Sequence, residues 1–169
     1  MASRGDRFLG ILGLGVACGE LLAYGATFAH VAVHDTYAVS FMLLGIVAFI
    51  VFCPFFLRAC GALAKEPLAG LLRFVSPLPK WAITLCVVAI ASALVHLGIY
   101  YEFAEYGVPR ERSGKYTLET DGRIREISSD EYYAFSGHFG RAFTSELIAF
   151  SLVPALFYLC GVPRMKEVT

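Results

Sequence analysis

Four long apolar stretches dominate the chain and restrict what it can fold into. They cover approximately residues 8–33, 38–63, 81–103 and 139–161. Each is near or above the length of about 20 residues that an α-helix needs to cross about 30 Å of hydrocarbon. The sequence therefore predicts an all-α membrane protein, a bundle of four transmembrane helices that forms a single domain over residues 1–169.

The composition indicates that lipid is the natural solvent of this chain. Hydrophobic residues make up 57% of the sequence and charged residues only 17%, which is more apolar surface than a soluble domain of this size can bury. The formal net charge is zero and no long basic or acidic block is present, so the charge pattern gives no support for nucleic-acid binding. We expect a multi-pass protein of the plasma membrane.

The first apolar stretch has a second interpretation. Arg4 and Arg7 precede an apolar core, and the run Gly15–Cys18 is similar to a lipoprotein cleavage site, which would make the stretch a secretory signal. However, a lipoprotein site prefers Leu where Gly15 stands, and hydrophobic residues continue to Val33. A membrane-spanning helix is therefore the favoured interpretation.

The distribution of Lys and Arg predicts the orientation, because positively charged flanks of membrane helices tend to stay in the cytoplasm. The first connection, residues 34–37, has no Lys or Arg. The third connection, residues 104–138, carries both charges in balance, and long connections follow the rule weakly. Both termini are therefore expected in the cytoplasm. The basic residues assigned to the cytoplasmic side are Arg4, Arg7, Arg58, Lys65, Arg73, Lys80, Arg164 and Lys166.

Residues 104–138 are expected to form an extracytoplasmic insertion with structure of its own. Two β-prone runs flank Asp121-Gly122, a dipeptide favoured in two-residue hairpin turns because both positions tolerate positive φ. We predict a β-hairpin over residues 115–127 that sets Leu118 opposite Arg125. Because an isolated hairpin is marginally stable in water, this one is expected to rest on the helices or on a partner.

A helix start follows the hairpin. Ser128 and Glu131 match a capping box, in which the serine hydroxyl accepts from the backbone N–H of Glu131 and the glutamate reaches back. This pattern predicts a short interfacial helix whose aromatic residues suit the headgroup region. The Ser136-Gly137 pair is expected to bend the chain into the fourth span. The aromatic residues are Tyr132, Tyr133 and Phe135.

Ionisable side chains near the outer ends of the helices form a candidate site. Each one at membrane depth costs about 2.5–3.5 kcal/mol, so it requires a partner or a function. Such a cluster can bind a metal, a haem, a quinone headgroup or a proton in transit. The alternative interpretation is that Arg141 and Glu146 pair with histidines only to hold helices together. The candidate residues are His30, His96, His138, Arg141 and Glu146.

Glu20 is a separate candidate, near the middle of the first predicted helix. No cation is evident opposite it in the sequence. We expect a protonated carboxyl that hydrogen-bonds to a hydroxyl of its own helix or of a neighbouring one. The candidate hydroxyls belong to Tyr24, Thr84, Ser92 and Ser151.

The cysteines are interpreted as buried helix thiols. All five lie in apolar runs and none forms a Cys-x-x-Cys pair, which favours a structural role over metal or disulfide roles. They are Cys18, Cys53, Cys60, Cys86 and Cys160.

Two short stretches resemble known families. The run His34–Tyr37 resembles one in haem-copper oxidase subunit I, where such a loop lies near a metal, so His34 and Asp35 are candidate metal ligands as well as candidates for simple exposure to water. The helix that follows in that family carries haem-binding histidines, whereas residues 38–43 here contain none, so oxidase activity is not implied. Separately, Gly114–Gly122 together with residues 131–138 is similar to a pattern in small bacterial four-helix membrane proteins of unassigned activity.

Three functions remain open at this point. The favoured one is a non-enzymatic accessory subunit whose outer hairpin and aromatic helix bind a partner membrane protein or a second copy in a homo-oligomer. A second is a small redox protein in which His30 and His96 hold a haem, or in which the outer cluster holds a metal or quinone. A third is a proton-coupled transporter that uses Glu20 and Glu146. The sequence contains no phosphate loop or dinucleotide fingerprint and no Ser-His-acid order, so an ordinary hydrolase or nucleotide enzyme is not predicted.

Overall fold

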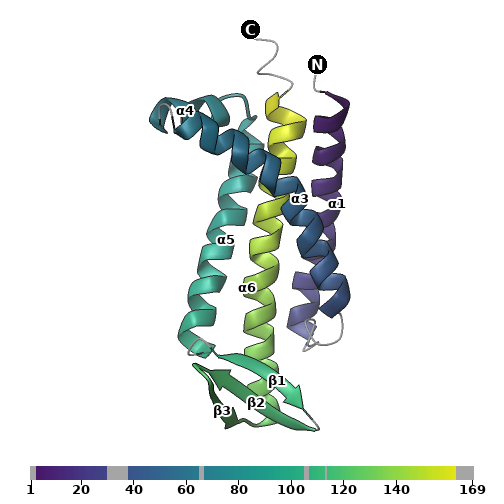
Figure 1. Ribbon diagram of the computed structural model, residues 1–169, viewed down its shortest axis with the longest axis vertical. Coiled ribbons are helices and arrows are strands. Elements are labelled where there is room, and N and C mark those ends of the chain that lie inside the picture. The colour runs from purple at the N-terminus through teal and green to yellow at the C-terminus, as the bar shows by residue number, and fades with distance from the viewer. Residues whose placement is uncertain (1–2, 30–37, 65–66, 105–106, 113, 163–169) are drawn as a thin grey trace.

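A computed structural model describes residues 3–29, 38–64, 67–104, 107–112 and 114–162. In this part of the chain, four helices are long and apolar enough to cross a membrane, as the sequence predicts. His30, His34 and Asp35 lie outside the described residues. A small antiparallel sheet occupies one end of the helix bundle, here called the sheet end, and the first and last described residues lie at the other, the terminal end (Figure 1).

Helix α6 is the centre of the bundle. It contacts each of the other three long helices and runs antiparallel to α1 and α5 (Figure 1). Small and hydroxyl side chains dominate the residues that it buries, which allows close approach of neighbouring helices. The bounds are Arg4–Ala26 for α1, Ala38–Leu63 for α3, Lys80–Ala104 for α5 and Ser129–Leu156 for α6, with a 3-10 turn, η1, at Thr27–Ala29 and a π-helix, η2, at Phe157–Gly161.

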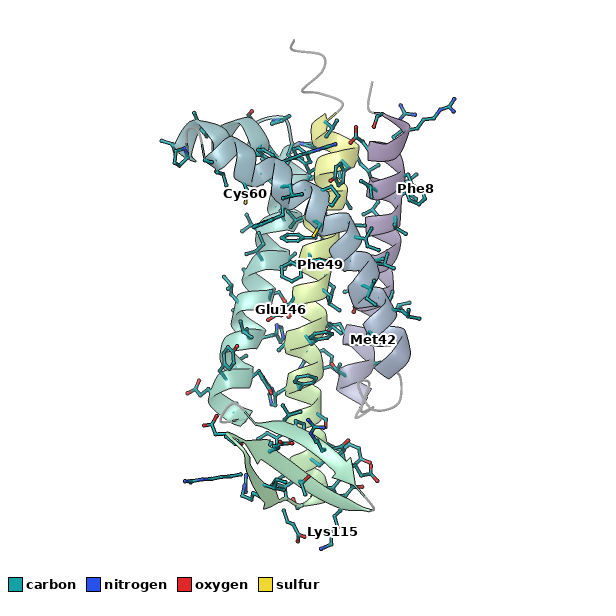
Figure 2. All side chains as sticks on the ribbon, in the orientation of Figure 1. Phe8, Met42, Phe49, Cys60, Lys115 and Glu146 are labelled. Carbon is teal, nitrogen blue, oxygen red and sulfur yellow. The ribbon has the colours of Figure 1, made fainter. Side chains whose placement is uncertain are left out.

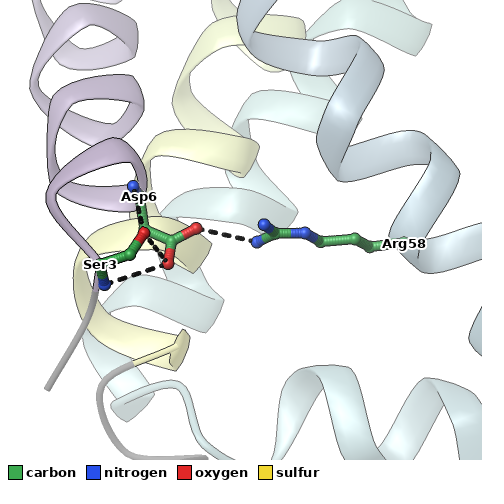
Figure 3. A network of polar contacts seen from close by, with 3 residues as sticks. All are labelled: Ser3, Asp6 and Arg58. Carbon is green, nitrogen blue, oxygen red and sulfur yellow. Dashed lines mark hydrogen bonds and ion pairs between the residues drawn. The ribbon is translucent and has the colours of Figure 1, made fainter.

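A polar network fixes the terminal end of α1 (Figure 3). Ser3 caps the helix, since its hydroxyl accepts from the Asp6 backbone N–H at 3.0 Å. The Asp6 carboxylate, which is 5% exposed, accepts a hydrogen bond from Arg58 of α3 at 3.0 Å. The Arg58 guanidinium also lies 5.4 Å from the ring centre of Tyr158. These contacts join α1, α3 and η2.

A short helix, α4 (Pro67–Val75), connects α3 to α5 and was not expected from the sequence. Phe74 stacks on Phe157 of η2 with ring centres 4.8 Å apart and meets Phe55 of α3 edge to face at 5.9 Å. Phe74 packs on the bundle, whereas Leu68 and Leu72 of the same helix are exposed. The helix therefore lies beside α3 at the terminal end, with only part of its apolar surface covered.

The sheet contains the predicted hairpin. Strands β1 (Val108–Arg112), β2 (Lys115–Thr120) and β3 (Arg123–Glu126) are antiparallel in the order β1-β2-β3. Leu118 pairs with Arg125 as predicted. Asp121 and Gly122 have φ of 49° and 76°, which is the conformation expected of a two-residue hairpin turn. Strand β1 was not predicted, because its charged residues are typical of an exposed loop as well as of an edge strand.

The sheet packs firmly on the first turns of α6. Leu118 is 2% exposed, and Tyr116 stacks on Tyr132 with ring centres 4.6 Å apart. The predicted capping box is confirmed, since the Ser128 hydroxyl accepts from the Glu131 N–H and the Glu131 carboxylate accepts from the Ser128 N–H. The sheet and α6 therefore form one unit.

The expected bend at Ser136-Gly137 is wrong. Helix α6 is continuous from Ser129 to Leu156, so no separate short interfacial helix precedes the fourth span. Ser136 and Gly137 are both buried, and small side chains at a helix contact permit close packing that outweighs their low helix propensity. Tyr132, expected in the headgroup region, is 1% exposed and lies beneath the sheet.

All five cysteines are free thiols. Cys86 is buried, as expected, but Cys18 and Cys60 lie on exposed helix surfaces. An apolar run does not determine which side of a helix faces the bundle. A cysteine in such a run can therefore face either lipid or a neighbouring helix, and the sequence does not distinguish the two.

Candidate functional site

The structure divides the predicted polar cluster into two sites. His96, His138 and Arg141, here called the sheet-end cluster, lie in the half of the bundle nearer the sheet, where His138 interacts electrostatically with both His96 and Arg141. Glu146 lies about halfway along the bundle (Figure 2) and lines a different space, between α3, α5 and α6. The prediction of one site for all five residues stays a prediction, because Glu146 lines a separate groove and His30 lies outside the described residues.

His96 is fixed by hydrogen bonds to α1 and to its own helix. Its Nδ1 lies 2.8 Å from the Ser92 carbonyl oxygen, which can only accept, so Nδ1 carries a proton. Its Nε2 lies 3.0 Å from the Tyr24 hydroxyl, and in the neutral ring this nitrogen accepts from the hydroxyl. Both ring nitrogens are therefore engaged by protein atoms.

Aromatic rings surround the other two members of this sheet-end cluster. His138 stacks on Phe103 of α5 with ring centres 4.7 Å apart. The Arg141 guanidinium lies 5.0 Å from the ring centre of Phe28, a cation–π geometry. Ion pairs between described residues include neither Arg141 nor Glu146. The alternative interpretation, in which these two residues pair with histidines to hold helices together, is therefore not seen in the described part of the chain.

The sheet-end cluster does not form a metal site from the described residues. They contain no group of three His, Cys, Asp or Glu side chains close enough to hold a metal ion. A haem bound through His96 would require Nε2 to exchange its Tyr24 hydroxyl for the iron. The geometry suits hydrogen bonding between α1 and α5 better than ligation.

Helices α1 and α6 approach each other very closely. A Cβ atom built on Gly13 would lie 2.9 Å from the Ser151 carbonyl oxygen. At the sheet end, a Cβ built on Gly140 would lie 3.0 Å from the Thr27 side chain. Small residues at these positions are therefore required for the contact.

Glu20 lies between these two contacts and is completely buried. Its side chain is 0% exposed, and neither carboxyl oxygen has a hydrogen-bond partner in the described part of the chain. On the facing helix, the Thr144 hydroxyl donates to the Gly140 carbonyl at 2.6 Å. The expected hydrogen bonds of Glu20 are absent, because the four candidate hydroxyls bond elsewhere: Tyr24 and Ser92 to His96, Thr84 to the Lys80 carbonyl, and Ser151 to the Leu147 carbonyl.

Glu146 faces a groove of about 560 Å³. Its side chain is partly exposed, and the rest of the lining is apolar. Glu146 of α6 on the groove side and Glu20 of α1 on the opposite side of α6 are therefore two carboxyls in very different surroundings. The apolar lining comprises Phe52, Phe55, Ile90, Ala93, Leu94, Leu97, Ala149, Phe150 and Val153.

Outside the spans, the sheet carries an exposed ion pair. Lys115 Nζ lies 2.7 Å from Glu126 Oε1 on the outer face of the sheet. The hydrogen bond to Glu126 raises the pKa of Lys115, and the same bond lowers the pKa of Glu126. The two charges of this pair therefore neutralise each other on a solvent-exposed surface of the sheet.

Sequence reasoning missed Tyr24 as the partner of His96 and the ion pair of Asp6 with Arg58. The second was accessible, because the sequence places opposite charges at the start of the first helix and the end of the second, and these ends meet in an antiparallel pair. The contact of Tyr24 with His96 was not accessible, because it depends on how α1 is rotated about its own axis, which the sequence does not determine.

Comparisons with protein-family models, with curated proteins and with solved structures found no match for this chain.

Proposed function

We propose that this chain is a non-enzymatic membrane subunit that presents its sheet outside the cytoplasm as a template for an extended segment of a partner protein. The distribution of Lys and Arg supports an orientation with the terminal end in the cytoplasm. The partner adds a strand to β3, a recognition mode in which backbone hydrogen bonds supply the affinity.

The anchoring of the sheet supports this proposal. Leu118 and Tyr132 are almost fully buried between the sheet and α6, and Arg125 of β3 lies 3.6 Å from Glu131 of α6. The orientation of β3 is therefore fixed by a helix long enough to cross the membrane, which lowers the entropic cost of binding.

The free edge of β3 is the observation that carries the proposal. Strand β3 is last in the sheet order, and all four of its residues are exposed. The Ile127 N–H donates to the Tyr116 carbonyl, and backbone groups alternate in direction along a strand. The N–H and C=O of Ile124 and Glu126 therefore face away from β2, and the Ile124 side chain is 65% exposed.

Proline at position 124 tests this proposal. Ile124→Pro removes only an outward-facing N–H, so the pairing of β2 with β3 remains while strand addition is blocked. Proteins that co-purify with the tagged full chain from its native membranes are quantified by mass spectrometry. We expect the partner to be lost with Ile124→Pro and retained with Ile124→Val. Unchanged co-purification with Ile124→Pro contradicts the proposal.

The unpartnered Glu20 carboxyl favours a second candidate, proton-coupled transport. Glu20 lies one helical turn from Tyr24, whose hydroxyl bonds to His96, so exchangeable protons extend from the sheet end towards the middle of the bundle. In proteoliposomes that contain a pH-sensitive dye, an imposed potential should drive proton entry that Glu20→Gln reduces. Equal rates for both proteins contradict this candidate.

A further inference from the structure

The groove that contains Glu146 is a candidate binding site independent of the sheet. It lies between α3, α5 and α6 and has a volume of about 560 Å³, within the range of about 300–1,000 Å³ typical of small-molecule sites. Leu94 on its wall is 65% exposed and Phe150 is 42% exposed, so the groove opens at the outer surface of the helices, where lipid surrounds a membrane protein.

Glu146 is the one ionisable side chain among the residues that line this groove. It has no hydrogen bond or ion pair with another described residue. An ionised carboxylate in apolar surroundings is costly unless a cation accompanies it. The described protein supplies no such cation, so a ligand with a positive charge would complement the groove.

Aromatic rings provide a second feature that favours a cation. Phe52 of α3 and Phe150 of α6 lie with ring centres 4.8 Å apart, and Phe55 lies 6.2 Å from Phe52. The face of an aromatic ring attracts an organic cation, and the ring also provides apolar contact area. A metal ion or a small hydrated cation would gain little from the ring faces or from their apolar contact area.

We propose that the groove binds a lipophilic organic cation from the membrane, with its positive charge beside the Glu146 carboxylate and its apolar substituents against Phe52, Phe55 and Phe150. A lipid acyl chain would fill the apolar walls but would leave the carboxylate without a partner. The acyl chain is therefore the competing occupant that an experiment must separate.

Tetraphenylphosphonium is a suitable probe, because tetraphenylborate has the same shape and the opposite charge. Binding of each ion to the purified full chain in a non-ionic detergent is measured by equilibrium dialysis. We expect saturable binding of tetraphenylphosphonium that Glu146→Gln weakens about tenfold or more. Glu102→Gln is the matched control, since Glu102 is exposed on α5 and outside the groove, and it should leave the affinity unchanged.

Carbodiimide labelling provides a test that requires no variant. Dicyclohexylcarbodiimide modifies protonated carboxyls in apolar surroundings, and mass spectrometry reports Glu20 and Glu146 separately. Tetraphenylphosphonium should slow the modification of Glu146 without affecting that of Glu20, which lies at a different interface. The proposal is overturned if neither ion binds saturably, if both bind equally, or if Glu146 is not protected.

Discussion

The two sides of α6 pack against their neighbours differently, closely on the α1 side and loosely on the side of α3 and α5. On the α1 side, glycines bring the helices together until a Cβ on Gly13 would lie 2.9 Å from the Ser151 carbonyl oxygen. On the side of α3 and α5, phenylalanines hold the helices apart around a groove of about 560 Å³. In lipid, where no hydrophobic force drives helices together, small residues permit association and bulky ones limit it.

The two carboxyls differ accordingly. Glu20 is fully buried on the tight side and has no hydrogen-bond partner among the described residues. Glu146 is partly exposed to a groove that does have room. An enclosed carboxyl such as that of Glu20 can bind a proton, whereas a carboxyl that faces a groove, such as that of Glu146, can also bind a larger cation.

The largest effect is expected from Gly13→Leu. A Cβ at this position would meet the Ser151 carbonyl oxygen at 2.9 Å and the Val51 side chain at 3.0 Å, so the helices must separate, at a cost of about 3 kcal/mol. Gly98→Leu is the control, because a Cβ on Gly98 meets nothing within 4 Å. Thermal unfolding in detergent measures both variants. Similar losses for the two would contradict the contrast between tight and open surfaces.

Glu20→Leu should stabilise the protein by about 1–3 kcal/mol, because it removes a buried carboxyl that has no hydrogen-bond partner. Glu146→Leu should stabilise it less, since Glu146 is only partly buried. Chemical denaturation in mixed micelles compares the two variants with the unmodified chain. A loss of stability for Glu20→Leu would mean that this carboxyl has a structural partner.

Filling the groove should have a smaller effect. Ala149 lines it and is 8% exposed, so Ala149→Leu adds apolar volume to open space and should raise stability by about 1 kcal/mol. The same substitution should weaken binding of tetraphenylphosphonium. A destabilised Ala149→Leu variant would show that the walls are packed more tightly than the groove volume indicates.

These contrasts also explain what the sequence could predict. Helix α3 has the predicted bounds, residues 38–63, because length and hydropathy determine a span. The Asp121-Gly122 turn determined the hairpin register because only a few turn types connect two residues. By contrast, α4 was missed, since nine residues with one Pro are too short for a clear helical period.

The candidate site was harder to predict for a geometric reason. Residue counting gives depth along a helix, at about 1.5 Å per residue, but not the direction in which each side chain points from the bundle. Ser145 and Glu146 are neighbours in the chain, yet Ser145 faces α1 and α5 whereas Glu146 faces α3 and α5. Similar depth therefore placed Glu146 and His96 in one predicted cluster that the rotation of α6 separates.

The smallest effect is expected at the sheet, where the ion pair of Lys115 with Glu126 faces water. The Lys115 and Glu126 side chains are 69% and 70% exposed, so their ion pair is screened and adds little stability. The lowered pKa of Glu126 means that its contribution is present above the ordinary value of 4.5 and is lost as the pH falls through the lowered pKa. The raised pKa of Lys115 means that its contribution is present below 10.5 and is lost as the pH rises through the raised pKa.

Amide chemical shifts of β2 and β3, recorded by NMR as a function of pH, measure this contribution. They should stay nearly constant between about pH 5 and 10 and change slightly outside that window. Glu126→Gln should remove the part of both the acidic and the basic change that depends on this ion pair, since each pKa shift arises from the partner. Loss of the sheet near neutral pH would contradict this assignment. It would indicate that a buried group at the helices, and not the exposed pair, controls the fold of the sheet.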